Sequence, residues 1–148
     1  MTTSCLTPFG PVSLRDDGVR ITHLVWGAGE GEAGPLQREG LAQLAAYFDR
    51  RLTVFDLPLD WGQGLHEKVR RAMAAIPLGE TRTYGEIARE AGAPAQAVGQ
   101  ACGANPVPII IPCHRVLGAN RLGGFSAPGG VETKVALLRF EGAAGLLI

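Results

Sequence analysis

Residues 105–115 read Asn-Pro-Val-Pro-Ile-Ile-Ile-Pro-Cys-His-Arg, and this stretch decides the fold and chemistry expected of the 148-residue chain. Its first four residues predict a stiff turn, and residues 109–111 are interpreted as a short buried strand that ends at Cys113. A lone cysteine is most often a buried, inert side chain. Here His114 and Arg115 can lower the thiol pKa and supply a base, and catalytic thiols lie in electropositive, partly exposed settings. The stretch therefore predicts a reactive cysteine.

A proton relay can be built around this cysteine. Adjacent side chains of an extended chain point to opposite faces, so His114 is not expected to touch the Cys113 sulfur, and a bridging water is the simpler link. A third group is needed to fix the imidazole tautomer. Glu141, at the end of the last predicted helix, is the available carboxylate. The sequence thus predicts a relay from cysteine through histidine to glutamate.

Three helices are predicted upstream of the cysteine. Apolar residues recur at helical spacing over residues 65–76. Thr83 and Glu86 fit a capping box, which predicts a short helix over residues 84–91. A Gly-containing turn leads to a third helix over residues 95–104. Two helices joined by such a turn form the helix-turn-helix arrangement that places its second helix in a DNA groove.

The helix-turn-helix pattern is weak evidence for DNA binding by itself, because many such pairs are purely architectural. The side chains expected on the surface of the second helix are small, and a minor groove about 6 Å wide admits only a close approach. These residues are Ala95, Ala97, Gly99 and Ala101.

The first 60 residues have a different pattern. Apolar residues alternate weakly over residues 12–24 around an Asp-Asp-Gly sequence, which predicts a β-hairpin. Helical spacing follows over residues 41–48, and residues 53–59 are interpreted as another strand. An acidic, Gly-containing linker over residues 60–64 marks the predicted domain boundary.

The predicted fold is therefore a small α/β N-terminal domain, an antiparallel sheet plus a helix, over residues 1–60. A mostly α-helical domain with the helix-turn-helix follows over residues 61–148. Net charge is zero, but the first part holds five Arg/Lys against eight Asp/Glu and the second nine against six. The second domain is the basic one, with a modest electrostatic contribution to DNA binding.

Composition narrows the protein class. The 46% hydrophobic and 19% charged fractions are typical of a globular protein, and no apolar run approaches the roughly 20 residues of a membrane helix. The N-terminus has no secretory pattern, and three widely spaced cysteines suit a reducing compartment, so a cytoplasmic protein is expected. His23, His66 and Cys5 are too scattered to predict a metal site.

In its cysteine motif and three further motifs, the chain resembles the O6-alkylguanine-DNA alkyltransferases, also called methylated-DNA–protein-cysteine methyltransferases. Four motifs match in family order, and together they cover nearly all of the second domain. They are residues 79–84, 97–99, 105–116 and 123–126, the last followed by Lys134, Leu137-Leu138 and Glu141-Gly142.

The resemblance implies stoichiometric, irreversible transfer of an alkyl group from O6 of guanine to Cys113, without a cofactor. It implies that His114 deprotonates the thiol through water, that Glu141 orients His114, and that Asn105 holds the turn that shapes the site. It also implies that Tyr84 donates its hydroxyl to N3 of the leaving guanine and favours flipping of the nucleotide.

The same resemblance identifies the expected partner as double-stranded DNA, bound through its minor groove by a monomer, with the damaged nucleotide flipped into a pocket. Residues expected to contact DNA or substrate are Tyr84, Gln96, Ala97, Gly99, Arg115, Val116 and Ser126.

Two positions depart from the family. Gln96 stands where an arginine normally fills the space left by the flipped nucleotide, and Arg70 stands where tryptophan is frequent. Three alternatives stay open. The first is a non-enzymatic, alkyltransferase-like protein that binds lesions and signals to other repair pathways, in which the cysteine is replaced; Cys113 argues against it and Gln96 keeps it open. The others are a thiol hydrolase and a purely structural Cys113.

Overall fold

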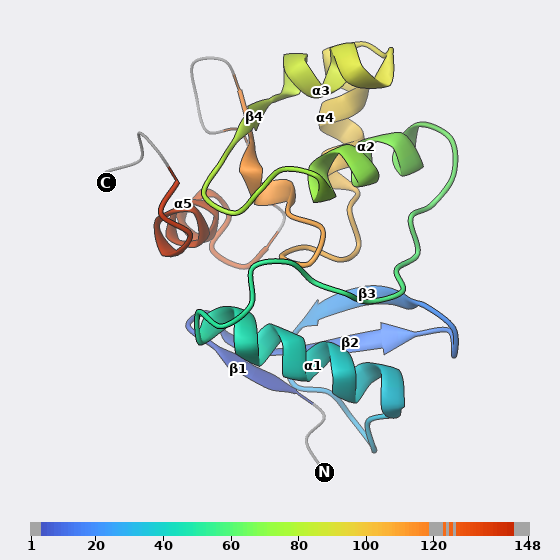
Figure 1. Ribbon diagram of the computed structural model, residues 1–148, viewed down its shortest axis with the longest axis vertical. Helices are drawn as coiled ribbons and strands as arrows, with labels where there is room; N and C mark the ends of the chain where they lie inside the picture. Colours follow the sequence, from blue (N-terminus) through green and yellow to red (C-terminus); the bar gives the residue numbers. More distant parts are fainter. Residues whose placement is uncertain (1–3, 119–122, 124, 126, 144–148) are drawn as a thin grey trace. The chain divides into compact units, whose positions relative to one another are not determined.

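The computed structural model describes residues 4–118, 123, 125 and 127–143 (Figure 1). The chain divides into two compact units, Met1–Asp60 and Trp61–Ile148. Each is described by itself. Within the described residues, no helix combines the length and the apolar character needed to cross a membrane.

The first unit is a three-stranded antiparallel sheet with one helix, as predicted. Its strands β1 (Cys5–Thr7), β2 (Gly10–Asp16) and β3 (Ile21–Trp26) lie in sequence order, and α1 (Pro35–Phe48) contacts β1 and β2. The predicted hairpin is β2–β3; β1 was not predicted. A Cβ atom at Gly40 of α1 would meet the end of the Leu14 side chain of β2, which would have to shift, so glycine suits this close approach of helix and sheet.

The strand predicted over residues 53–59 is wrong. Only Leu59 forms a bridge, to Ile21. The backbone of Asp56 is instead bonded by a side chain of α1: the Asp56 N–H donates to Oε1 of Gln43, and Nε2 of Gln43 donates to the Asp56 carbonyl, both at 2.9 Å. Pro58 has no N–H to give a strand ladder.

The second unit is mostly helical. Its helices α2 (Leu65–Ala74), α3 (Tyr84–Ala91) and α4 (Ala95–Gly103) contact one another (Figure 1). All three were predicted, and the capping box is confirmed: Oγ1 of Thr83 accepts from the Glu86 N–H at 3.1 Å, and Oε1 of Glu86 accepts from the Thr83 N–H at 2.9 Å.

A short parallel pair connects this helical group to the cysteine. Strands β4 (Arg82–Thr83) and β5 (Val116–Leu117) were not predicted; β4 runs directly into α3, and β5 directly follows the 3-10 helix η1 (Cys113–Arg115). The last helix, α5 (Val131–Phe140), contacts η1. The pairing therefore ties the start of α3 to the segment that carries the thiol.

Residues 109–111 form a buried turn, so the predicted strand is wrong here too. The Ile111 N–H donates to the Val107 carbonyl at 2.9 Å, and Ile109 has a φ of 71°, which β-branched residues rarely adopt. The run looks like a strand because all three isoleucines are buried. The flanking prolines cannot donate to a sheet, and the isoleucines fill the core from a turn instead.

Candidate active site

Cys113 is the first residue of η1 and is only 7% exposed. The prediction of a partly exposed thiol is therefore wrong. Residues 113–115 are helical, so the extended backbone expected at His114 is also wrong. Burial raises the pKa of the Cys113 thiol; a hydrogen bond from the Asn105 side chain and the positive charge of Lys134 oppose this rise. The resting thiol is therefore protonated and needs a base before it can attack.

His114 is the candidate for such a base. Its side chain is fully buried, and its Nε2 lies 2.8 Å from Oε2 of Glu141. Its Nδ1 has no hydrogen-bond partner among the described residues. Burial lowers the pKa of His114, although Glu141 opposes this shift. The imidazole is thus neutral, with a proton on Nε2 and a lone pair on Nδ1.

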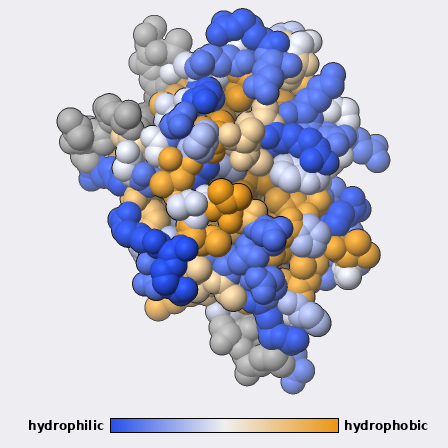
Figure 2. Space-filling model, in the orientation of Figure 1, coloured by the Kyte–Doolittle hydropathy of each residue, from blue (hydrophilic) through white to orange (hydrophobic). Residues whose placement is uncertain are grey.

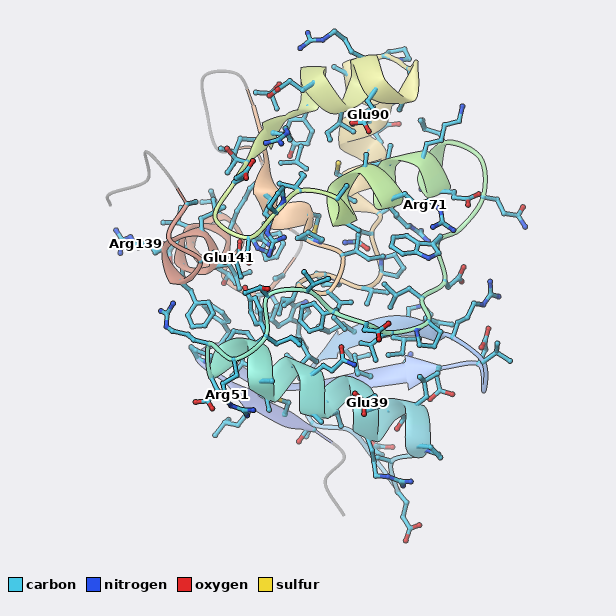
Figure 3. The ribbon with its side chains drawn as sticks, in the orientation of Figure 1. Glu39, Arg51, Arg71, Glu90, Arg139 and Glu141 are labelled. Atoms are coloured by element: carbon cyan, nitrogen blue, oxygen red, sulfur yellow. The ribbon has the colours of Figure 1, made fainter. Side chains whose placement is uncertain are left out.

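Glu141 caps the C-terminus of α5 and is bonded on both oxygens. Nε of Arg115 donates to Oε1 and Nη2 to Oε2, each at 2.9 Å. Burial alone would raise the pKa of Glu141, but the hydrogen bonds from His114 and Arg115 outweigh it and lower the pKa to about 2. Figure 3 shows Glu141 among the side chains of the interior, whereas Arg139 of the same helix projects outward. Glu141 is a fixed anion.

The predicted contacts of Arg115 and Val116 with DNA need correction. Arg115 is 5% exposed, and its remaining nitrogen, Nη1, donates to the Ile76 carbonyl at 2.7 Å. Val116 is fully buried, and its carbonyl accepts from Lys134. Arg115 turns inward because a buried carboxylate, 26 residues away in sequence, offers a bidentate partner.

Asn105 joins the two ends of the buried turn. Its Nδ2 donates to the Ile111 carbonyl at 2.8 Å, and its Oδ1 accepts from the Val107 N–H at 3.1 Å. The Cys113 N–H in turn donates to the Ile111 carbonyl at 2.8 Å. Asn105 thus fixes the backbone that leads into the thiol.

Lys134 is a charged group that sequence reasoning did not assign to the site. It is fully buried on α5; its Nζ donates to the Val116 carbonyl at 2.7 Å and lies 5.8 Å from the centre of the Tyr84 ring. Burial lowers its pKa to about 8, against the opposing influence of Cys113 and Cys102. The available signal was its helical spacing, because Lys134 precedes the buried Leu137 and Leu138 by one turn.

Cys102 is a second buried thiol in this neighbourhood, on α4. Burial raises its pKa to about 12, and Cys113 adds to that rise. All three cysteines of the chain are free and buried. The raised pKa makes Cys102 a poor nucleophile.

The remaining predicted contacts lie on the surface helices or outside the described residues. Tyr84 begins α3 with its hydroxyl against Gly123, where an added Cβ would lie 2.8 Å from the oxygen. Gln96 is exposed on α4, with Ala97 and Gly99 half-buried, whereas Ala101 is buried, contrary to expectation. Ser126 lies outside the described residues.

In the part of the chain that the structure describes, no group of three or more His, Cys, Asp or Glu side chains is arranged to hold a metal ion.

Comparisons with known proteins agree with this arrangement. Residues 64–143 match the family described as "6-O-methylguanine DNA methyltransferase, DNA binding domain". The methylated-DNA–protein-cysteine methyltransferase of Mycobacterium tuberculosis is 42% identical over 151 residues, spanning 91% of this chain and 88% of that protein. The protein of the same name from Methanosarcina acetivorans is 40% identical over 150 residues, with 93% and 95% covered.

A solved structure extends the likeness to the fold. The crystal structure of Mycobacterium tuberculosis OGT in complex with DNA superposes with a TM-score of 0.79 at 41% identity, covering 97% of this chain and 95% of that one. Sequence and structure therefore agree over most of the chain, and this protein belongs to the family of methylated-DNA–protein-cysteine methyltransferases.

Proposed function

We propose that this protein repairs DNA directly, by moving the alkyl group of an O6-alkylguanine onto Sγ of Cys113. The observation that carries the proposal is the unpartnered, buried Nδ1 of His114, one residue from a thiol that burial keeps protonated. A neutral imidazole held by a carboxylate is a suitable base for such a thiol.

The reaction is a single displacement. The thiol proton passes through a water to Nδ1 of His114, and the thiolate attacks the alkyl carbon. The sulfur–carbon bond forms as the bond between carbon and O6 breaks, and the electron pair stays on the guanine oxygen. By the family resemblance, Tyr84 donates to N3 of the leaving base and Ser126 lines the pocket near O6. The thioether is not hydrolysed, so each molecule acts once.

DNA is the proposed partner, bound as a duplex by a monomer. The relative whose structure is solved in complex with DNA supports DNA as the partner. Three residues separate α3 from α4, which supports a helix-turn-helix, and the small residues of α4 would suit the minor groove. The base must leave the stack to expose its O6 atom, at a cost of a few kcal/mol. The reducing compartment suited to free thiols is the cytoplasm.

The deciding experiment is the intact mass of the protein after mixing with a duplex that carries O6-methylguanine. A gain of one methyl group, mapped to Cys113, is expected. Cys113→Ser should gain nothing, and Cys102→Ser, which removes the neighbouring buried thiol, should gain the methyl group as the wild type does.

The same measurement tests the second candidate function, lesion binding without transfer, which the exposed Gln96 keeps open. Tight binding of the lesion duplex with no change of mass would favour that function. Release of unmodified enzyme after many turnovers on an ester or peptide would favour a thiol hydrolase.

Gln96 should limit the rate of repair. Glutamine lacks the charge and the five-donor fork of arginine, so we expect slower flipping and weaker binding than in relatives with arginine. Gln96→Arg should raise the single-turnover rate and the DNA affinity. Gln100→Arg, at another exposed position of α4, is the matched control for added charge. Equal gains in both variants, or none in Gln96→Arg, would remove the idea.

A further inference from the structure

Arg115 and His114 share one carboxylate. Oε2 of Glu141 accepts from Nε2 of His114 at 2.8 Å and from Nη2 of Arg115 at 2.9 Å, and Oε1 accepts from Nε of Arg115 at 2.9 Å. All three side chains are buried. A permanent cation therefore lies on the same anion that holds the imidazole.

Burial is the largest influence on the pKa of His114 and lowers it, and Glu141 and Arg115 act on that pKa in opposite directions. A carboxylate beside an imidazole favours the imidazolium form, typically by about one to three pKa units for a close opposite charge. A protonated His114 would have no lone pair on Nδ1 for the thiol proton. An arginine does not lose its charge, and Arg115, bonded to both oxygens, opposes this influence of the carboxylate.

The other charged or titratable groups that act on His114 are few. Among the described residues, Glu141 at the end of α5 favours its charged form, whereas Arg115 of η1 and Lys134 of α5 disfavour it. In the proposed function, Cys113 of η1 is its proton donor. Lys134 donates to the Val116 carbonyl, whereas Arg115 contacts the carboxylate directly.

We propose that Arg115 is a positioning residue that neutralises Glu141, so that His114 stays uncharged with its Nδ1 lone pair free to accept the thiol proton. The inference rests on the proposed function, in which His114 is the base. The arginine of the Pro-Cys-His-Arg sequence then serves proton transfer from the interior and does not contact DNA.

Nitrogen NMR of the labelled histidines tests this directly. The chain has three histidines, and His23 and His66 are exposed and serve as internal markers. In the wild type, His114 should be neutral at pH 7 with its proton on Nε2. In Arg115→Gln its titration midpoint should rise by about one pH unit or more, and in Arg115→Lys, which keeps a charge but loses the fork, by less.

The matched control is Arg71→Gln, the same change at an exposed arginine paired with Glu67, which should leave the midpoint unmoved. A doubly protonated His114 in the wild type at pH 7 overturns the proposal, as does an unchanged or lower midpoint in folded Arg115→Gln. Should Arg115→Gln fail to fold, as circular dichroism would reveal, the wild-type tautomer and Arg115→Lys decide.

The rate of methyl transfer gives a second readout. Below the shifted midpoint, Arg115→Gln should be slower by about tenfold for each pH unit of the shift, and it should approach the wild-type rate at higher pH. A purely structural role would slow transfer equally at every pH. The histidine titration does not depend on transfer, so a chain that titrates as expected but never gains a methyl group would refute the proposed function alone.

Discussion

The two units of this protein differ in whether charged side chains are buried. In residues 1–60 the ion pairs Arg20–Asp17 and Arg51–Asp49 are exposed, and the buried polar residues that the structure describes there, Thr7 and Ser13, carry no charge. Figure 2 shows hydrophilic side chains together with hydrophobic ones on the face in view. In residues 61–148, several charged or titratable side chains are buried: Arg70, His114, Arg115, Lys134 and Glu141.

Burying a charge costs several kcal/mol unless hydrogen bonds and an opposite charge offset it. The first unit avoids this cost and relies on its apolar core. The second accepts it around Cys113, which the proposed chemistry explains, because a proton relay needs groups with shifted pKa values. In this protein, buried charged groups therefore indicate the candidate site around Cys113 better than exposed ion pairs do.

The strongest test of this contrast removes the central anion. Glu141→Ala should lower the free energy of unfolding by about 3–5 kcal/mol, because it leaves the buried Arg115 without its carboxylate. Urea denaturation measures the loss. In the first unit, Arg51→Ala should cost less than about 1 kcal/mol. Similar losses in the two variants would contradict the contrast.

Lowering the pH should remove the stabilising contribution of the same carboxylate, Glu141. The pKa of Glu141 is lowered from 4.5 to about 2, so the unfolded chain binds its proton first as the pH falls. Its stabilising contribution is complete above about pH 4.5 and is lost toward pH 2, a change of about 3 kcal/mol. Glu141→Gln should show a shallower loss of stability in this window. Parallel curves for the two proteins would argue against an ion-paired Glu141.

A smaller effect is expected at an exposed contact in the second unit. Thr83→Ala removes the side-chain cap of α3 and should cost about 1 kcal/mol, measured by the same denaturation. Thr83 and Glu141 lie in the same unit but differ in burial, so the two losses of stability show whether burial or location in residues 61–148 sets their size. A loss as large as that of Glu141→Ala would favour membership of the unit.

Local patterns were enough for most of the secondary structure. Helical spacing predicted α1 to α4, and Thr83 with Glu86 predicted where α3 begins. The two failed strands share a cause. In residues 53–59 and 109–111 the backbone is bonded by the side chains of Gln43 and Asn105 or within its own turn, and apolar content does not reveal such partners.

The site was predicted in part for a similar reason. The grouping of Cys113, His114 and Glu141 came from chemistry and from family resemblance, and the contact between His114 and Glu141 is present in the structure. Arg115 was expected to contact DNA or substrate on the family resemblance. Its real partner is distant in the sequence, and only the folded chain brings the two together.

Ile109 makes the turn before Cys113 dependent on the folded core. A β-branched residue at a φ of 71° is held against its local preference, at a cost of order 1–3 kcal/mol. Burial of its side chain and the bonds made by Asn105 offset this cost, and both require the surrounding core. The place of Cys113 is therefore set by residues distant in the sequence and not by the local preference of the segment that carries it.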